Sequence, residues 1–406
     1  MCSRITAAPV DISFRQWILG AAEAGGQLLC LLNIVSLPSG NIYFQIHILN
    51  LIKEADMTKI NSHHSDANII YMGIDVHEVT YNISLFNQGE EIFSQHCNAT
   101  YDAIRKIVKR FRSFSFCAVY EAGAFGYGLY DQLKKDGVNI IVTPPSKVLR
   151  SQDDTVKTDK RDARKLAQHL SAGLLKAVCV PSMQIRQDRE LLRTRDQLVD
   201  QRRRIYQQIQ SKLRYHNLPL RSKGTITILN KTVLFQMPLS VPMRIAFSEL
   251  INLYDFYSQR LRFLRNEIIK LSESKPYATA VSLLQSIPGV GLFASLAWLL
   301  ELPAMQHFQS DDKLASFLGL TPTESSSGRK RRLGSISKTG NPKIRWLLIQ
   351  CSWILIGKDP VMQQCFSRIK RRRGSQCAIV AVARKLSARM RAVLIHQTPY
   401  AIGTIS

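Results

Sequence analysis

The sequence predicts an α/β domain followed by a mostly helical region, and three observations support this fold class. Short apolar or alternating segments typical of strands lie between residues 69 and 143, where helical patterns separate the later ones. Two long, charged segments with helical periodicity follow at 185–215 and 241–271. Apolar helical segments then continue to residue 393. A chain of 406 residues is long enough for two or three such domains.

The first strands of the α/β region are expected to form a hairpin-linked meander. A meander followed by alternating helices and strands is the element order of a ribonuclease-H-like fold. A doubly wound nucleotide-binding sheet is less favoured, because crossovers rather than hairpins would join its first strands. The expected strands are 69–76, 79–87, 91–96, 114–120 and 139–143, and the expected helices are 101–111, 126–135 and 159–170.

The two long charged helices favour an antiparallel coiled-coil arm or a dimerisation element over a third globular core. The residues between them, 221–244, are expected to be irregular. Further along, the centre of 283–302 reads IPGVG, which is similar to the turn of a helix-hairpin-helix unit. Such a turn would offer the backbone N–H groups of Gly289 and Gly291 to a DNA phosphate, although a plain helical hairpin fits equally well.

The last predicted helices, 344–356 and 379–393, flank a basic patch at 370–373. The predicted domains are 57–180 for the ribonuclease-H-like part, 181–275 for the arm and 276–406 for the C-terminal helical part. The first 56 residues differ in composition, since their net charge of −1 leaves +26 for the remainder of a chain that totals +25. We expect the working protein to begin near Met57, with a small helical appendage as the alternative.

The net charge of +25 indicates a polyanionic partner. A membrane partner is not indicated, because the most apolar stretch is too short to span a bilayer and contains proline and glycine. The eight cysteines include no C-x-x-C pair, so neither a zinc site nor a disulfide framework is predicted, and a reducing cytoplasm is the simplest compartment.

A basic segment, 319–345, combines three adjacent serines, a run of cations and a second small-residue turn. Backbone N–H groups, cations and hydroxyls in this arrangement suit a nucleic-acid backbone. A solvated basic loop is the alternative. The candidate nucleic-acid contacts in the segment are Arg329, Lys330, Arg331, Arg332, Ser335, Ser337, Lys338, Lys343 and Arg345.

Four carboxylates lie where they could meet at one edge of the sheet. Asp75 ends the first strand, Glu121 follows the fourth, and Asp159 and Asp162 share one face at the start of a helix. Close carboxylates repel one another unless cations neutralise them, and Mg²⁺ is the default ion beside phosphate. Taken singly, each acid could be an ordinary strand-end or helix N-terminal carboxylate.

These motifs resemble a known family, the DEDD transposases of IS110 and IS1111 insertion sequences. The resemblance is carried by GID at 73–75, YEAG at 120–123 and KTDKRDA at 157–163, then by SIPGVG at 286–291 and the serine segment. It implies an N-terminal RuvC-like domain whose four acids, Asp75, Glu121, Asp159 and Asp162, bind Mg²⁺ as two ions. It also implies a C-terminal transposase domain.

The resemblance further implies a recombinase that excises and inserts its own insertion sequence. In this family a serine that precedes a glycine would attack DNA and form a transient covalent link. Ser327 matches this serine, and Ser326 is the second choice. A structured guide RNA would pair with the element ends and target DNA, and homodimers would assemble into a tetramer. The site would then form between the RuvC-like domain of one subunit and the transposase domain of another, in a bacterial cytoplasm and on the nucleoid.

Two other functions fit the same composition. A RuvC-like junction nuclease would use water in place of the serine, and a non-catalytic nucleic-acid-binding protein would use the acids only structurally. Basic charge does not separate the three functions, because each predicts strongly salt-dependent binding to nucleic acid.

Overall fold

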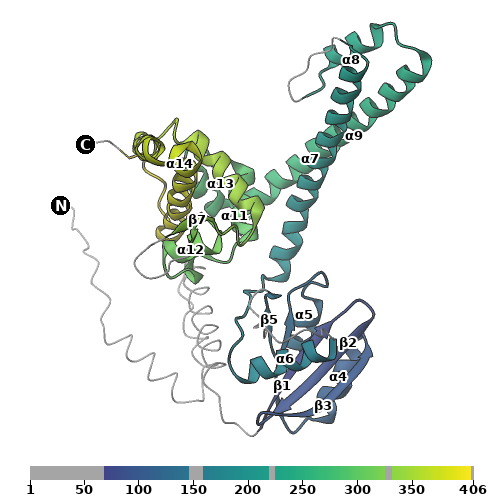
Figure 1. The fold of residues 1–406 in the computed structure, drawn as a ribbon, viewed down its shortest axis with the longest axis vertical. Helices are drawn as coiled ribbons and strands as arrows, with labels where there is room; N and C mark the ends of the chain where they lie inside the picture. The colour runs from purple at the N-terminus through teal and green to yellow at the C-terminus, as the bar shows by residue number, and fades with distance from the viewer. Residues whose placement is uncertain (1–67, 146–158, 219–224, 325–331, 404–406) are drawn as a thin grey trace, which may run out of the picture. The chain divides into compact units, whose positions relative to one another are not determined.

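The computed structural model describes residues 68–145, 159–218, 225–324 and 332–403 (Figure 1). Residues 1–67, which include the first 56 residues, and the three adjacent serines at 325–327 lie outside the described residues. The chain divides into two compact units, Met1–Val178 and Cys179–Ser406, and each is described by itself. The three domain limits expected from the sequence stay predictions.

Unit 1 is built on a mixed five-stranded sheet in the order β3-β2-β1-β4-β5. Strand β1 pairs antiparallel with β2 and parallel with β4, while β2 pairs antiparallel with β3 and β4 parallel with β5. This order matches the predicted ribonuclease-H-like arrangement. The strands are β1 Ile69–Val76, β2 Thr80–Asn87, β3 Glu90–Asn98, β4 Ser115–Glu121 and β5 Asn139–Thr143, and the helices are α4 Tyr101–Arg110, α5 Gly128–Lys135 and α6 Asp159–Ser171.

Helix α6 lies directly on the sheet because β1 has a glycine where the helix crosses it. A Cβ atom added to Gly73 would stand 2.1 Å from the carbonyl oxygen of Ala163 and 2.5 Å from the backbone nitrogen of Ala167. Ala163 and Ala167 are one helical turn apart, so their small side chains face the strand together. The N-terminus of α6 is therefore brought close to the end of β1.

Unit 2 begins with two 33-residue helices that run antiparallel, α7 (Met183–Tyr215) and α9 (Val241–Glu273) (Figure 1). One end of the pair packs with Leu192 and Ile268 in the main core of the unit. The other end encloses a separate cluster that includes Ile209 of α7 and Phe247 of α9. The antiparallel helix pair expected from the sequence is present, and its coiled-coil or dimerisation role stays a prediction.

The connection between α7 and α9 corrects the expectation of an irregular segment. Helix α8 (Ile228–Gln236) starts with a capping box, in which Thr227 and Asn230 bond each other's backbone N–H groups. Its Leu234 is buried in the distal cluster of the arm. The helix therefore depends on packing against α7 and α9, which its local sequence does not reveal.

The remainder of unit 2 is a helical body with one short hairpin. The buried Trp298, Leu314 and Leu386 belong to a single core that draws on most of its helices. Its elements are α10 Ala278–Gln285, α11 Leu292–Glu301, the 3-10 helix η2 Met305–His307, α12 Asp311–Phe317, β6 Pro322–Glu324, β7 Leu333–Ile336, α13 Pro342–Leu355 and α14 Pro360–His396.

Two further expectations are corrected in this body. The basic residues 370–373, expected between two helices, are themselves helical and end the first part of α14, which breaks at the non-helical Gly374 before its second part. Residues 334–336 of the small-residue turn expected at 334–340 belong instead to strand β7, which pairs antiparallel with β6. The second correction arises because β7 has a pairing partner, β6, that the local sequence does not reveal.

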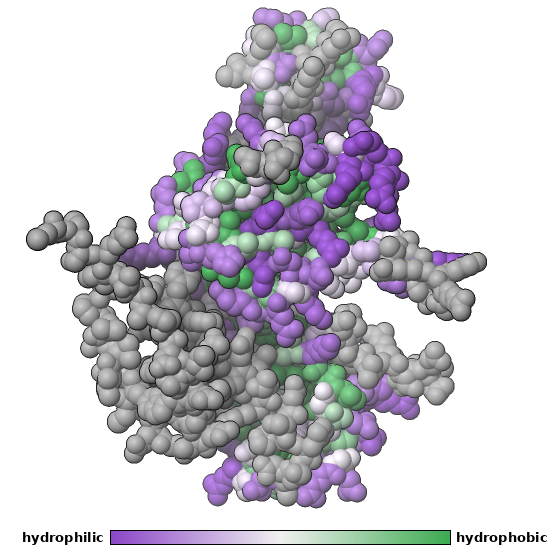
Figure 2. Space-filling model, turned by 90° about the vertical axis from the view of Figure 1, so that its left-hand side faces the viewer, coloured by the Kyte–Doolittle hydropathy of each residue, from purple (hydrophilic) through white to green (hydrophobic). Residues whose placement is uncertain are grey.

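None of the helices within the described ranges has the length and apolar character that crossing a membrane requires. On the face shown in Figure 2, hydrophilic residues predominate in the described part of the surface, and hydrophobic residues form separate patches between them.

Gly73→Ala is expected to destabilise unit 1 by about 1–3 kcal/mol, because the added methyl group forces α6 away from β1. Urea unfolding followed by circular dichroism measures the effect. Gly128→Ala is the matched control, since a Cβ atom there meets nothing within 4 Å. Equal unfolding midpoints for the two variants would contradict the close contact between α6 and β1.

Candidate functional site: an acid cluster and a serine hairpin

The predicted acids of unit 1 gather where β1, β4 and α6 meet. Asp75 is the penultimate residue of β1, and Asp159 and Asp162 lie in the first turn of α6. Ile74 pairs with Tyr120 in the parallel register of β1 and β4, so Glu121 lies one residue further along the neighbouring strand. The strand register and the helix contact together place all four predicted acids in this region of unit 1.

His77 completes a compact group with Asp75 and Asp159. Its Nε2 atom lies 3.1 Å from Oδ2 of Asp75 and 3.6 Å from Oδ2 of Asp159. One ligand atom from each of the three residues lies within 4.8 Å of the other two. From the sequence, His77 is expected to be a plain surface histidine, with a hydrogen bond to a metal ligand or a DNA contact as the alternative, because its contact with Asp159 depends on how α6 crosses the sheet.

Burial raises the pKa of Asp75 above its ordinary value. The imidazole of His77 opposes this shift through charge and a hydrogen bond, whereas Asp159 and Asp162 add to it by repulsion. Asp75 is the least accessible member, with 21% of its side chain exposed against 58% for Asp159. A nearby cation would favour the ionised form of Asp75, so the cluster fits a divalent metal ion.

A row of polar side chains extends from Asp75 across the sheet. Asp75 pairs with Asn82 of β2, and Asn82 pairs with His96 of β3, so the three side chains share a face. The Nδ1 atom of His96 lies 2.9 Å from the Oδ1 atom of the buried Asn82. On the other side, Glu121 pairs with Thr143 of β5, whose hydroxyl is buried without a hydrogen-bond partner among the described residues.

The serine hairpin of unit 2 is formed by β6 and β7. Ser326, Ser327, Arg329, Lys330 and Arg331 lie outside the described residues, between these strands. Arg332, Ser335 and Lys338 are exposed, and Ser337 is half-buried, with its Oγ atom 3.1 Å from Oγ1 of Thr339. The described residues thus include the two strands that lead into and out of the serine motif.

The turn after the hairpin is tightly packed against the end of α12. A Cβ atom on Gly319 would stand 2.2 Å from the carbonyl oxygen of Thr339, and one on Gly340 would stand 2.1 Å from that of Phe317. Arg345 donates hydrogen bonds from a single nitrogen to the carbonyl oxygens of Leu318, Thr339 and Gly340. Arg345, a predicted nucleic-acid contact, therefore holds this turn together.

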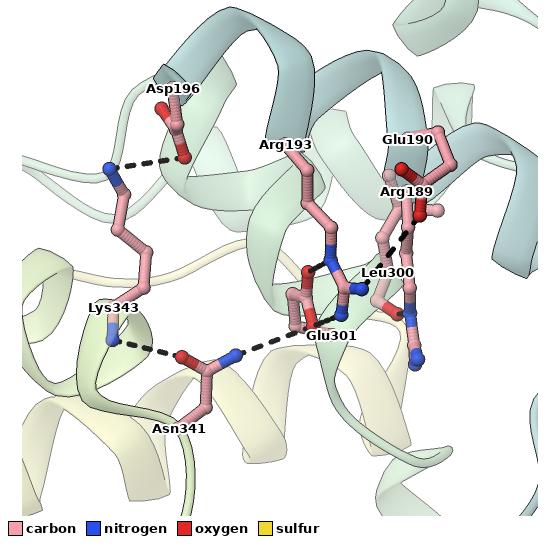
Figure 3. Close-up of polar contacts among 8 residues, drawn as sticks. All are labelled: Arg189, Glu190, Arg193, Asp196, Leu300, Glu301, Asn341 and Lys343. Carbon is pink, nitrogen blue, oxygen red and sulfur yellow. Dashed lines mark hydrogen bonds and ion pairs between the residues drawn. The ribbon is translucent and has the colours of Figure 1, made fainter. Parts of the chain in front are cut away.

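Lys343 also has an intramolecular partner, because its Nζ atom lies 3.1 Å from Oδ2 of Asp196 on α7. Glu301 of α11 lies between Arg193 of α7 and Asn341 at the start of α13 (Figure 3). Arg193 donates two hydrogen bonds of 2.9 Å to the Glu301 carboxylate, and Asn341 donates one of 3.3 Å.

These contacts link the arm to the helix that follows the serine hairpin. The Oδ1 atom of Asn341 accepts a hydrogen bond from the backbone nitrogen of Lys343 and so caps α13. The same asparagine therefore joins the capped N-terminus of α13 to Glu301. Charges at the base of the arm hold together three helices that are distant in the sequence.

The IPGVG turn forms a helical hairpin between α10 and α11. Gly289 has a φ of 90°, and a Cβ atom there would stand 2.6 Å from the carbonyl oxygen of Cys351 on α13. Its lack of a side chain thus serves packing inside unit 2. Gly291 is exposed at the N-terminus of α11, and contacts of Gly289 or Gly291 with a DNA phosphate remain predictions.

Comparison with known proteins agrees with this architecture. A transposase model for the DEDD proteins of IS110 elements matches residues 72–217, and a model described as "Transposase IS116/IS110/IS902 family" matches residues 281–367. The putative transposase y4qE of Sinorhizobium fredii is 31% identical over 300 residues, which cover 71% of this chain and 72% of that protein. The chain belongs to the IS110 family of transposases.

Two other relatives are transposases of named insertion sequences. The IS1533 transposase of Leptospira borgpetersenii is 28% identical over 79% of this chain and 94% of its own length. The IS1111A transposase of Coxiella burnetii is 28% identical over 61% of this chain and 69% of its own length. The predicted family and the predicted class of enzyme, a DNA transposase, are confirmed. Membership of a DEDD family implies a divalent metal, which the donor set of Asp75, His77 and Asp159 fits.

Asp75→Asn is expected to raise the melting temperature at pH 7 in metal-free buffer. Burial makes the pKa of Asp75 higher in the folded chain than in the unfolded chain. The free energy of unfolding therefore falls as pH rises from the ordinary pKa of an aspartate through the raised pKa of Asp75. The gain should disappear as pH falls below the ordinary pKa of an aspartate, where both states are protonated. Thermal unfolding across this pH range measures the difference.

The control for this experiment is Asp102→Asn, which removes an exposed carboxylate in α4 and should bring no gain at pH 7. A variant at Asp75 that melts below the unmodified protein at every pH would contradict the unfavourable burial of its carboxylate.

Proposed function

We propose that this transposase excises and inserts its own insertion sequence by cleaving and rejoining DNA strands at the acid cluster. The observation that carries this proposal is the meeting of Asp75 on a strand with Asp159 and Asp162 on a helix, in a chain of a DEDD transposase family. Glu121 is the fourth acid. Two Mg²⁺ ions bound by the four acids would stabilise charge on the phosphodiester oxygens.

Ser327 is the proposed nucleophile, with Ser326 as the second choice. The pairing of β6 with β7 brings the described residues on either side of the serine motif, Glu324 and Leu333, next to each other, which supports presentation of the motif from one place on unit 2. A serine hydroxyl is a weak nucleophile until a base or a metal activates it. In our proposal the acid cluster supplies this activation, from the same or another subunit.

The proposed partners are DNA at the element ends and target, together with a structured guide RNA that pairs with both. The net charge of +25 supports binding to polyanions such as DNA and RNA. Cations of the serine segment, including the exposed Arg332 and Lys338, would contact the phosphates. Exposed cations at the break of α14, Lys370 and Arg371–Arg373, extend the available basic surface. A protein that cleaves and rejoins chromosomal DNA would be located in the bacterial cytoplasm, at the nucleoid.

The arm is the proposed dimerisation element, and dimers are proposed to pair into a tetramer. Helix α9 exposes Ile245, Phe256 and Phe263, with 59%, 55% and 50% of each residue accessible. Spacings of 11 and 7 residues put all three on one face of the helix. An apolar stripe at nearly heptad spacing is typical of a helix that packs against another helix, which supports pairing with the arm of a second copy.

Removing the nucleophile is expected to abolish the covalent intermediate and to slow strand rejoining severely. We expect Ser327→Ala to lose the protein–DNA adduct, trapped by denaturation during reaction with a labelled element end, and to rejoin strands at least about 1,000-fold more slowly. Ser316→Ala, at an exposed serine of α12 outside the proposed site, is the control and should retain the adduct.

Two results would contradict this proposal. If Ser327→Ala and Ser326→Ala both cleave and rejoin normally, the serine is not the nucleophile; cleavage by water without an adduct would favour a junction-resolving nuclease. If Asp75→Ala leaves excision and integration intact, the acids are structural, as expected for a non-catalytic nucleic-acid-binding protein.

Charges placed in the apolar stripe are expected to separate the arms. Phe256→Glu combined with Phe263→Glu should weaken self-association at least about tenfold, because two charges would have to be desolvated in the interface. Light scattering across a concentration series measures the change. Phe125→Glu, at an equally exposed phenylalanine of unit 1, is the control, and equal association of the two proteins would refute the arm as the dimer contact.

A further inference from the structure

His77 introduces a nitrogen atom into a site whose other donors are carboxylate oxygens. It lies just beyond β1, in the turn to β2, where its backbone nitrogen donates a 3.1 Å hydrogen bond to the carbonyl oxygen of Thr80. This bond fixes the backbone that carries the imidazole. The side chain then lies between Asp75 on the strand and Asp159 on the helix.

The separations of these atoms fit ligands of one ion. Neighbouring ligand atoms of an octahedral ion, each about 2.1 Å from the metal, lie about 3 Å from each other. The Nε2 atom of His77 is 3.1 Å from the Asp75 oxygen and 3.6 Å from the Asp159 oxygen. Small side-chain movements would therefore allow all three atoms to contact a shared cation, without a change in the backbone.

A nitrogen ligand changes which divalent ion the site favours. Mg²⁺ is a hard ion that takes oxygen ligands, whereas imidazole suits first-row transition metals, of which Mn²⁺ shares the octahedral geometry and oxygen preference of Mg²⁺. We propose that His77 is a nitrogen ligand of the ion held by Asp75 and Asp159, and that it biases this site towards Mn²⁺ over Mg²⁺. This inference rests on the metal-binding part of the proposed function.

The competing interpretation is that His77 only hydrogen-bonds to Asp75 and stays outside the coordination sphere. The two interpretations differ in one spectroscopic property, the coupling between bound Mn²⁺ and a nitrogen nucleus. Pulsed electron paramagnetic resonance detects this coupling in the unmodified protein, so the result does not depend on whether a variant folds.

The experiment titrates the full chain with Mn²⁺ and follows the signal of free Mn²⁺, with Mg²⁺ added as a competitor. We expect nitrogen coupling in the unmodified protein and its loss in His77→Ala. The substitution should weaken Mn²⁺ binding about tenfold and Mg²⁺ binding by less than about threefold. His216→Ala, at an exposed histidine of the arm, is the matched control and should bind like the unmodified protein.

Asp75→Asn distinguishes failure of this inference from failure of the proposed metal site. If it loses both ions while His77→Ala keeps its Mn²⁺ affinity and the unmodified protein shows no nitrogen coupling, the acids bind metal and the role of His77 is refuted. If Asp75→Asn binds both ions as tightly as the unmodified protein, the proposed acid site fails, and the inference about His77 fails with it.

Discussion

The contact between α6 and β1 at Gly73 is the constraint on which the acid cluster depends. With no side chain at this position, the backbone of the helix rests against the strand, at distances that a methyl group would not allow. The first turn of α6 then brings Asp159 to His77. The site thus depends on the absence of a side chain at Gly73, because a side chain at this position would separate Asp75 on the strand from Asp159 and Asp162 on the helix.

The cluster also stores unfavourable electrostatic energy that a cation would relieve. Asp75 is partly buried beside two other carboxylates, and both burial and repulsion oppose its ionisation. His77 offsets part of this cost. A site that is unfavourable without a cation and favourable with one is suited to metal binding, which agrees with membership of a DEDD transposase family.

In unit 2, charges that suggest nucleic-acid binding also have structural roles. Arg345 bonds to three carbonyl groups of the turn after the hairpin, and Lys343 pairs with the arm. Counting the cations of this segment in the sequence therefore overestimates how many side chains are available to bind phosphates. Exposed cations such as Arg332 are therefore the ones proposed to contribute more to binding phosphates.

The sequence by itself determined the order of elements in unit 1, the two long helices of the arm, and the positions of Asp75, Asp159 and Asp162 at a strand end and a helix start, because hydrophobic periodicity and strand ends are local properties. It did not reveal α8, whose Leu234 depends on a cluster built by α7 and α9. Nor did it reveal the position of His77, or the row formed by Asn82 and His96. Those features were decided by the tertiary structure, since strand register and the crossing of α6 bring together residues whose neighbours are distant in the chain.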